Sequence, residues 1–222
     1  MSQRKIILVT GASRGLGFAL AESMGALGHH IIALARTQGG LTALDDAIQA
    51  AGGPQATLVP CDMSDHHDQL DALGAHVYER FGKLDGLVLN AAHLGELAPA
   101  AQTTPKEWHT CMMVNATANF RLLRSLAPLL QQAAGSFVLG ITCQSLMSHT
   151  AYWSAYRASK MAFECLLQSF AAEQPTGGGI NVRLNDPGPM ATKLHAAAYP
   201  GHDPAQLPNA RDAAQKIITQ LF

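Results

Sequence analysis

Short apolar runs alternate with longer amphipathic stretches along the whole chain. The run Ile6-Ile7-Leu8-Val9 is apolar throughout, as expected of a strand buried on both faces of a parallel sheet. We expect strands of this kind at residues 6–10, 30–35, 56–60, 84–89, 136–141 and 180–184. We expect helices at residues 18–24, 41–51, 65–81, 105–132 and 212–221, and in the segment that contains Tyr156. This alternation, without a linker or repeat, predicts one α/β domain over residues 1–222, with a doubly wound parallel sheet and helices on both faces.

A glycine-rich segment, Thr10-Gly11-Ala12-Ser13-Arg14-Gly15-Leu16-Gly17, joins the first expected strand to the first expected helix. Glycines at such a junction permit a tight turn and let a pyrophosphate approach the helix N-terminus, where free N–H groups favour anions. The segment therefore predicts a Rossmann-type dinucleotide site. Its expected binding residues are Gly11, Ser13, Arg14, Gly15, Leu16 and Gly17. The alternative is a loop with a structural role alone.

Arg36 stands at the end of the second expected strand. Dinucleotide-binding folds usually carry an acidic residue there, about 20 positions past the glycines, which binds the ribose 2′-hydroxyl. Two guanidinium groups, from Arg14 and Arg36, would instead suit a 2′-phosphate, so we expect NADP(H) rather than NAD(H). The alternative is that one or both arginines are solvated surface residues.

Tyr156 and Lys160 are four residues apart, so on a helix they project from the same face. A free phenol has a pKa of roughly 10, and a fixed cation beside it would bring that pKa toward the range of a general acid or base. Taken alone, such a pair is equally consistent with packing and solvation. Asn115 lies among Met112, Met113 and Val114 inside an expected helix, and it needs a hydrogen-bond explanation, either a kink-bridging water or a catalytic relay.

Composition excludes several other classes of protein. With 48% hydrophobic residues among 222, the chain can bury a large core, and its net charge of −1 does not indicate a nucleic-acid or acidic-membrane partner. No apolar run approaches the roughly 20 residues that span a bilayer. The four cysteines are far apart and the ten histidines lack metal-ligand spacing, so we expect no metal site and a reduced, cytoplasmic protein.

With these residues in place, the chain resembles a short-chain dehydrogenase/reductase of the single-domain, NADP-using type. Thr10-Gly11-x-x-x-Gly15-x-Gly17 matches the cofactor loop of that family, and Tyr156-x-x-x-Lys160 matches its catalytic signature. Asn115 matches the helix asparagine of its catalytic tetrad. Asp62, followed by Met63, matches the acidic residue that contacts the adenine ring in that family. Asn90-Ala91-Ala92 is similar to its Asn-Ala-Gly element after the fourth strand. Pro187-Gly188, with Thr192, is similar to the segment that holds the nicotinamide carboxamide.

The resemblance implies an NADP(H)-dependent oxidoreductase that transfers hydride between the nicotinamide and a small-molecule carbonyl or alcohol substrate. Tyr156 would donate a proton to the carbonyl, or remove it in the reverse direction. Lys160 would lower the pKa of Tyr156 and hydrogen-bond the nicotinamide ribose, so both residues would also contact the cofactor. Asn115 would hold a water that links Lys160 to solvent. The cofactor carries the hydride chemistry, and the protein contributes orientation and electrostatics.

The catalytic serine of the family has no clear counterpart. It usually lies about thirteen residues before the tyrosine, and the local sequence here is Gly140-Ile141-Thr142-Cys143-Gln144-Ser145. Counting back gives Cys143, whereas aligning the strand gives Thr142. We assign the role to Thr142 because a hydroxyl donates as serine does and a thiol donates weakly. The alternatives are that Cys143 or Ser145 fills this role, or that no residue does.

The resemblance also bears on the assembly. Family members usually continue into a seventh strand, and this chain stops at Phe222, so we expect a sheet of six strands. A homodimer through the two long helices, or a higher homo-oligomer, is expected.

The segment between Thr192 and Arg211 is expected to be a mobile lid over the nicotinamide. His195 and Tyr199 are its candidate substrate contacts. Leu94, Met147 and Trp153 are expected around a modest apolar pocket.

Two other hypotheses come from different functional classes. The chain could be a cofactor-binding sensor or regulatory scaffold with little turnover, which the imperfect serine position favours and the intact Asn115, Tyr156 and Lys160 oppose. A structural oligomer subunit is the third, and no specific feature supports it.

Overall fold

Six parallel strands form the centre of the molecule. The computed structural model describes residues 4–143 and 150–221. The strands are β1 (Ile6–Thr10), β2 (His30–Ala35), β3 (Thr57–Pro60), β4 (Gly86–Leu89), β5 (Phe137–Ile141) and β6 (Asn181–Asn185), in the order β3-β2-β1-β4-β5-β6. The order reverses between β1 and β4, and ligands of such sheets bind at this reversal, beyond the carboxyl ends of the strands. The predicted α/β class and the six-stranded sheet are confirmed.

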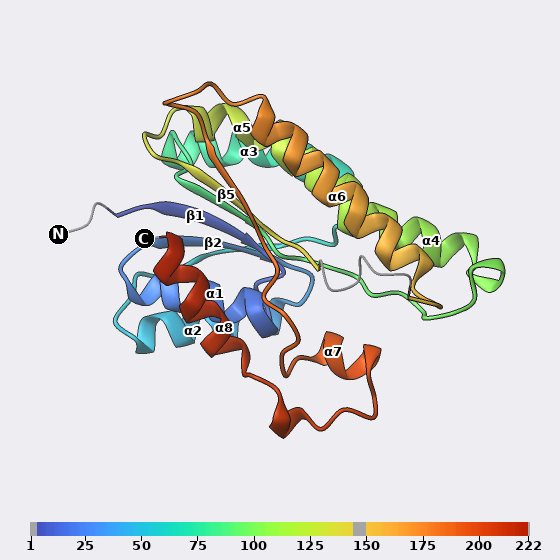
Figure 1. Cartoon of the computed structure of the whole chain (residues 1–222). Coiled ribbons are helices and arrows are strands. Elements are labelled where there is room, and N and C mark those ends of the chain that lie inside the picture. The colour runs from blue at the N-terminus through green and yellow to red at the C-terminus, as the bar shows by residue number, and fades with distance from the viewer. Residues whose placement is uncertain (1–3, 144–149, 222) are drawn as a thin grey trace.

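Helices cover both faces of the sheet, as Figure 1 shows. One face carries α1 (Gly15–Ala26), α2 (Gln38–Ala50) and α8 (Ala210–Leu221), and the other carries α3 (His67–Phe81), α5 (Ala118–Gln131) and α6 (Ser154–Ala172). Successive residues of β1 supply both layers, because side chains alternate along a strand: Ile7 and Val9 pack toward α1, whereas Leu8 packs toward α3 and α5. This two-sided burial explains why the strand sequence is continuously apolar.

The long helix expected at residues 105–132 is interrupted. It consists of α4 (Pro105–Met112), a π-helical turn η2 (Met113–Thr117) and α5. A π-helical turn inserts an extra residue into the helix and occurs frequently at functional sites. Asn115 lies inside this turn and is 1% exposed. The prediction of one uninterrupted helix was therefore wrong at Asn115.

The segment expected as a lid contains a short helix, α7 (Lys193–Ala198), which the sequence pattern did not predict. Thr192 caps it, because its Oγ1 accepts a hydrogen bond of 3.2 Å from the backbone N–H of His195. In Figure 1, α7 stands apart from the two helical layers, near the carboxyl ends of the strands. Two 3₁₀ turns, η1 (Ala100–Gln102) and η4 (Pro204–Gln206), lie in the connecting segments.

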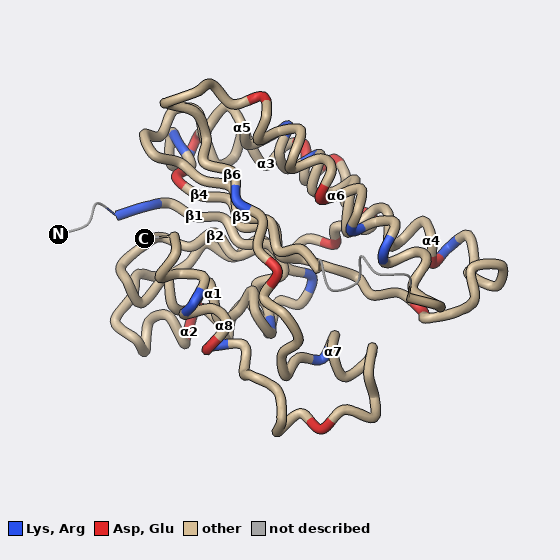
Figure 2. Tube along the Cα trace, viewed as in Figure 1, with Lys and Arg blue, Asp and Glu red and all other residues tan. Residues whose placement is uncertain are grey.

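Charged residues are spread over the outer helices, with Lys and Arg interspersed among Asp and Glu (Figure 2). Within residues 4–143 and 150–221, no helix is both long enough and apolar enough to cross a bilayer. In the same residues, no three His, Cys, Asp or Glu side chains gather as a metal site would require.

Helices α3 and α5 approach each other closely at Gly74. The backbone N–H of Gly74 donates a 2.9 Å hydrogen bond to Ser125 Oγ, and Ser125 Oγ donates a 2.8 Å hydrogen bond to the carbonyl oxygen of Asp71. A Cβ atom on Gly74 would lie 2.2 Å from the carbonyl oxygen of Ser125. The contact is with backbone, so a side chain here would force the two helices apart.

We predict that Gly74→Ala lowers the free energy of unfolding by about 1–3 kcal/mol, because overpacking shifts the backbone. Gly39→Ala is the matched control, since Gly39 also lies in a helix and a Cβ there meets nothing within 4 Å. The control should be neutral or stabilising, by up to about 1 kcal/mol. Urea unfolding of both variants measures the difference, and equal effects would contradict the close packing at Gly74.

Candidate active site

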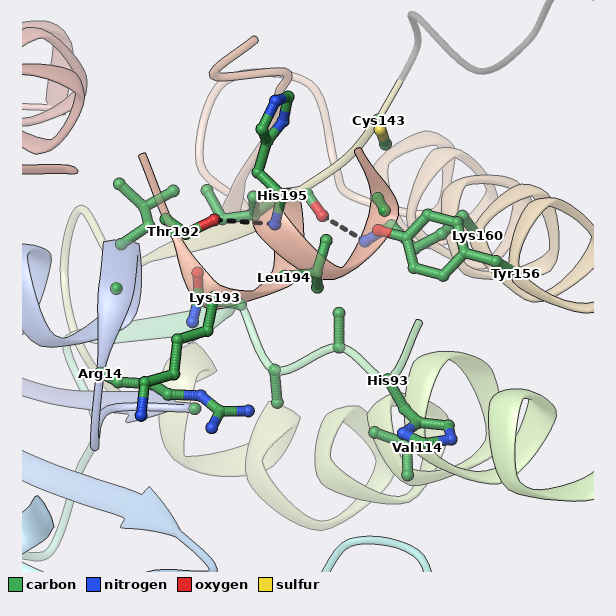
Figure 3. A pocket seen from close by; sticks show the side chains of 18 of the residues that line it. Arg14, His93, Val114, Cys143, Tyr156, Lys160, Thr192, Lys193, Leu194 and His195 are labelled. Atoms are coloured by element: carbon green, nitrogen blue, oxygen red, sulfur yellow. Dashed lines mark hydrogen bonds between the residues drawn. The ribbon is translucent and has the colours of Figure 1, made fainter. Parts of the chain in front are cut away.

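One cavity of about 720 Å³ runs along the carboxyl ends of the strands, from the glycine-rich segment to α6 and α7. Most of the site residues expected from the sequence line it: Gly11, Ser13, Arg14, Gly15, Leu16, Arg36, Asp62, Met63, Asn90, Ala91, Ala92, Thr142, Tyr156, Lys160, Pro187, Gly188 and Thr192. Gly17 and Asn115 do not line it and pack behind its wall. Figure 3 shows Arg14 at one end of the cavity and Tyr156 with Lys160 at the other.

The three glycines of the loop have different reasons to be glycine. Gly11 and Gly15 adopt left-handed backbone angles, with φ of 67° and 58°, which other L-residues rarely adopt. A Cβ on Gly17 would lie 2.5 Å from the carbonyl oxygen of Gly11 and 2.4 Å from Asn90 Nδ2. Backbone conformation therefore requires glycine at Gly11 and Gly15, and close packing against Asn90 requires it at Gly11 and Gly17. Helix α1 begins at Gly15, three residues earlier than expected, which brings its free N–H groups to the cavity.

Thr10 and Asn90 join the glycine loop to the end of β4. The buried hydroxyl of Thr10 accepts hydrogen bonds from the backbone N–H groups of Asn90 and Ala91, at 2.9 and 3.0 Å. The side-chain amide of Asn90 donates a 3.0 Å hydrogen bond to the carbonyl oxygen of Thr10. Asn90 thus lines the cavity as predicted, but its amide nitrogen is engaged in bracing the loop.

Arg36 and Asp62 lie at neighbouring strand ends. Arg36 Nη1 is 4.0 Å from Asp62 Oδ2, and the Arg36 side chain is 62% exposed. Burial would raise the pKa of Asp62, but hydrogen bonds from the hydroxyl and backbone N–H of Ser64, together with the charge of Arg36, hold it below its usual range. The carboxylate is therefore ionised at neutral pH and offsets part of the positive charge of Arg36.

Tyr156 and Lys160 project from one face of α6 into a buried part of the cavity, with 5% and 7% exposure. Lys160 Nζ donates a 2.6 Å hydrogen bond to the carbonyl oxygen of Ile141 (Figure 3). Burial lowers the pKa of Lys160 to about 8, against the opposing charges of Cys143, Glu164 and Asp186. Burial also raises the pKa of Tyr156, and Cys143, Asp186 and Cys111 act in the same direction. The expected lowering of the Tyr156 pKa is not found in this structure, where desolvation of the phenolate is the largest effect.

Asn115 connects three segments behind the cavity wall. Its Nδ2 donates to the carbonyl oxygen of His93 at 2.9 Å and to Ser159 Oγ at 2.8 Å, and its Oδ1 accepts from the backbone N–H of His93 at 2.7 Å. Asn119 Nδ2 donates to the carbonyl oxygen of Asn115 at 2.8 Å. Both amide hydrogens of Asn115 are engaged, so its side chain positions the segment after β4 and the Tyr156 turn of α6.

Thr142 and Cys143 both line the cavity after β5, so both stay candidates for the serine role. Thr142 is 4% exposed, and its backbone N–H donates a 2.8 Å hydrogen bond to the carbonyl oxygen of Asn185. Its Oγ1 is buried and has no hydrogen-bond partner among the described residues. A buried hydroxyl without a partner is rare and requires an explanation, such as a missing ligand. Ser145 and Met147 lie outside the described residues.

Aromatic rings form the cavity wall beyond Tyr156. Trp153 contacts the Tyr156 ring edge-on, with centroids 5.8 Å apart, and Tyr199 at the end of α7 lies 5.5 Å from Trp153. Tyr199 stacks on His202 at 4.8 Å. Leu94 packs against the Trp153–Tyr156 cluster. The segment expected as a lid thus supplies part of this wall, and His195 and Tyr199 both line the cavity; their contact with substrate stays a prediction.

His93 and Lys193 are among the lining residues that the sequence reasoning missed. His93 Nε2 lies 3.6 Å from Glu107 Oε2. Each directly follows a predicted cofactor residue, Ala92 and Thr192, so extending those motifs by one position would have found both.

Comparison with known proteins agrees with this geometry. The family model for "short chain dehydrogenase" matches residues 5–202. The uncharacterized oxidoreductase YciK of Escherichia coli (strain K12) is 32% identical over 210 residues, which cover 94% of this chain and 82% of that protein.

Solved structures show the same fold. A short chain dehydrogenase from Salmonella enterica serovar Typhi superposes with a TM-score of 0.93 at 29% identity, over 99% of this chain and 90% of that one. A metagenomic short-chain oxidoreductase, solved in complex with NADP, superposes with a TM-score of 0.82 at 31% identity, over 98% of this chain and 90% of that one. This chain therefore belongs to the short-chain dehydrogenase family of oxidoreductases.

Proposed function

We propose that this protein is an NADP(H)-dependent oxidoreductase of carbonyl and alcohol substrates, in which Tyr156 transfers the proton. One observation carries the proposal: the glycine loop and the Tyr156–Lys160 pair lie at opposite ends of a single cavity. We further propose that one domain supplies both the cofactor site and the catalytic groups.

The residues of the cavity fit a nicotinamide dinucleotide. Gly11 and Gly15 leave the loop without side chains, and the start of α1 offers free N–H groups to a pyrophosphate. Arg14 and Arg36 both line the cavity, and two guanidinium groups favour the 2′-phosphate of NADP(H) over the 2′-hydroxyl of NAD(H). When bound, the cofactor would supply or accept the hydride.

Tyr156 and Lys160 would act as a coupled pair. Because burial raises the pKa of Tyr156, the phenol stays protonated at neutral pH and is ready to donate its proton to a carbonyl oxygen. Lys160 is charged below a pKa of about 8, and its ammonium would stabilise the phenolate that forms as the proton leaves. This protonation state suits carbonyl reduction at neutral pH, whereas alcohol oxidation needs the phenolate and should be favoured by alkaline pH.

Thr142 is our candidate for the second hydrogen-bond donor to the substrate oxygen. Thr142 lines the cavity, and its buried Oγ1 has no hydrogen-bond partner among the described residues. A substrate carbonyl would supply that partner, and a donor placed at the developing negative charge accelerates reactions of this kind.

The wall near Tyr156 indicates an uncharged, apolar substrate. Trp153, Tyr199, Ala92, Ala198 and Val114 line this end of the cavity. His93 also lines the cavity; its Nε2 lies 3.6 Å from Glu107 Oε2 and has no hydrogen-bond partner among the described residues. Apolar and aromatic linings bind apolar ligands, with few polar groups to orient them. We therefore propose a small or medium-sized apolar ketone, aldehyde or alcohol.

The test is turnover of a panel of apolar ketones and aldehydes with NADPH, followed by the loss of NADPH absorbance. Tyr156→Phe should lower kcat by at least 100-fold, because a positioned general acid contributes roughly 10²–10⁴-fold. It should retain most of the NADPH affinity, since the phenyl ring preserves the packing and the other cofactor-binding residues are unchanged. Turnover should also be much more efficient with NADPH than with NADH.

Three results would contradict the proposal in different ways. Equal efficiency with NADH would remove the assigned role of Arg14 and Arg36. Full activity of Tyr156→Phe would remove the proton-transfer assignment. Binding of NADPH without turnover across the panel would support the sensor hypothesis instead.

Thr142→Val provides a separate test of the proposed hydrogen bond from Thr142 to the substrate oxygen. Removing an unpartnered buried hydroxyl should leave the free energy of unfolding unchanged or raise it by up to about 1 kcal/mol. The same change should lower kcat/KM for ketone reduction roughly 100-fold if the hydroxyl donates to the substrate oxygen. Thr142→Ser should retain activity. Cys143→Ala is the neighbouring control, and a larger loss in that variant would transfer the role to Cys143.

The lowered pKa of Lys160 predicts a pH-dependent stability. Between pH 8 and 10.5 the unfolded chain holds a proton on Lys160 that the folded protein has lost, so the free energy of unfolding rises with pH. We expect wild type to gain about 3 kcal/mol relative to Lys160→Met across this window, and no further change below it. Urea unfolding of both proteins at several pH values measures the gain, and parallel curves would show that the Lys160 pKa is not lowered.

A further inference from the structure

Two cationic side chains face the same cavity from different elements. Arg14 belongs to the glycine loop, and Lys193 is the first residue of α7. Figure 3 shows Lys193 reaching from α7 toward Arg14, at the end of the cavity away from Tyr156. The arrangement brings the start of the expected lid to the place where a glycine loop binds phosphate.

The start of α7 lies close to the glycine loop. A Cβ atom added at Gly15 would lie 3.5 Å from Thr192 Cγ2, an ordinary van der Waals distance, so the residue before Lys193 is a neighbour of the loop. Thr192 also caps α7 through its Oγ1, which fixes the direction in which the helix leaves the loop. Lys193 is therefore positioned over the glycine loop by a short and well-defined connection.

Neither cation is neutralised within the described part of the chain. The ion pairs there involve Arg36, Lys83, His93, Arg121 and Arg211, but neither Arg14 nor Lys193. Two like charges that converge on one cavity repel each other, and an anion bound between them removes the repulsion. Phosphate oxygens can accept hydrogen bonds from both groups. The planar Arg14 guanidinium can donate two parallel hydrogen bonds, and the Lys193 ammonium acts as a compact charge.

We infer that Lys193 is a cofactor-positioning residue that, together with Arg14, binds a phosphate group of the dinucleotide. The inference rests on the proposed function and adds to it a cofactor contact from α7. A cofactor contact at Lys193 would also affect the substrate end of the cavity. Helix α7 ends beside Tyr199, and Tyr199 packs against Trp153. One short helix thus connects a phosphate contact to the aromatic wall near Tyr156.

The experiment is a fluorescence titration of NADPH into the full chain without substrate. Lys193→Gln should weaken NADPH binding about tenfold, as expected for one charge-assisted hydrogen bond at an exposed site. It should also reduce the dependence of affinity on salt, because one fewer charge contacts the anion. Lys193→Arg should retain most of the affinity. Lys216→Gln is the matched control, since Lys216 is an exposed lysine of α8 that does not line the cavity.

The same titration with NADH separates the two phosphate sources. An equal loss for NADPH and NADH assigns Lys193 to the pyrophosphate, and a loss confined to NADPH assigns it to the 2′-phosphate; both results support the inference. Unchanged affinity and salt dependence in Lys193→Gln would overturn it. If wild type binds neither dinucleotide, the proposed function fails first, and that result is visible before any variant is compared.

Discussion

The hydrogen bonds between Thr10 and the end of β4 are the interaction on which the cavity depends. They join β1 to β4 at the point where the strand order reverses, and the Thr10 hydroxyl also donates to the carbonyl oxygen of Val88 at 3.3 Å. Asn90 completes the junction from its side chain, in space that exists only because Gly11 and Gly17 lack a Cβ. The glycine loop is therefore a packing requirement of the sheet as well as a candidate binding surface.

A second constraint comes from burial of the catalytic candidates. Water would solvate a phenolate and an ammonium well, but Tyr156 and Lys160 lie behind Trp153 and the end of β5. Burial penalises the charged form of each group, so it opposes the pairing that two exposed side chains would show. Tyr156 therefore stays neutral at pH 7, whereas Lys160, with a pKa lowered to about 8, is still charged there but loses its proton more easily than a free lysine. A bound ligand that contacts the charged form of either group would offset part of this desolvation cost.

The sequence predicted the strands, the glycine loop and the Tyr156–Lys160 face because each depends on local residue order. Continuous apolar runs, glycines at a strand–helix junction and a four-residue spacing are all visible without tertiary contacts. The π-helical turn at Asn115 was not visible, because it accompanies hydrogen bonds to the distant backbone of His93. The pKa directions were missed for a similar reason, since burial depends on what covers Tyr156 from other elements. Helix α7 is too short for periodicity to reveal, although Thr192 is a recognisable cap.

The aromatic contacts of α7 give its position a functional meaning. Tyr199 meets Trp153, and Trp153 meets Tyr156, so the helix is coupled to the catalytic end through packed rings rather than through the backbone of the sheet. At the other end of the same helix, Thr192 lies near Gly15, since a Cβ added there would be 3.5 Å from Thr192 Cγ2. The six residues of α7 thus separate the glycine loop from the aromatic end of the cavity. We therefore expect a ligand that orders one half of the cavity to help form the other.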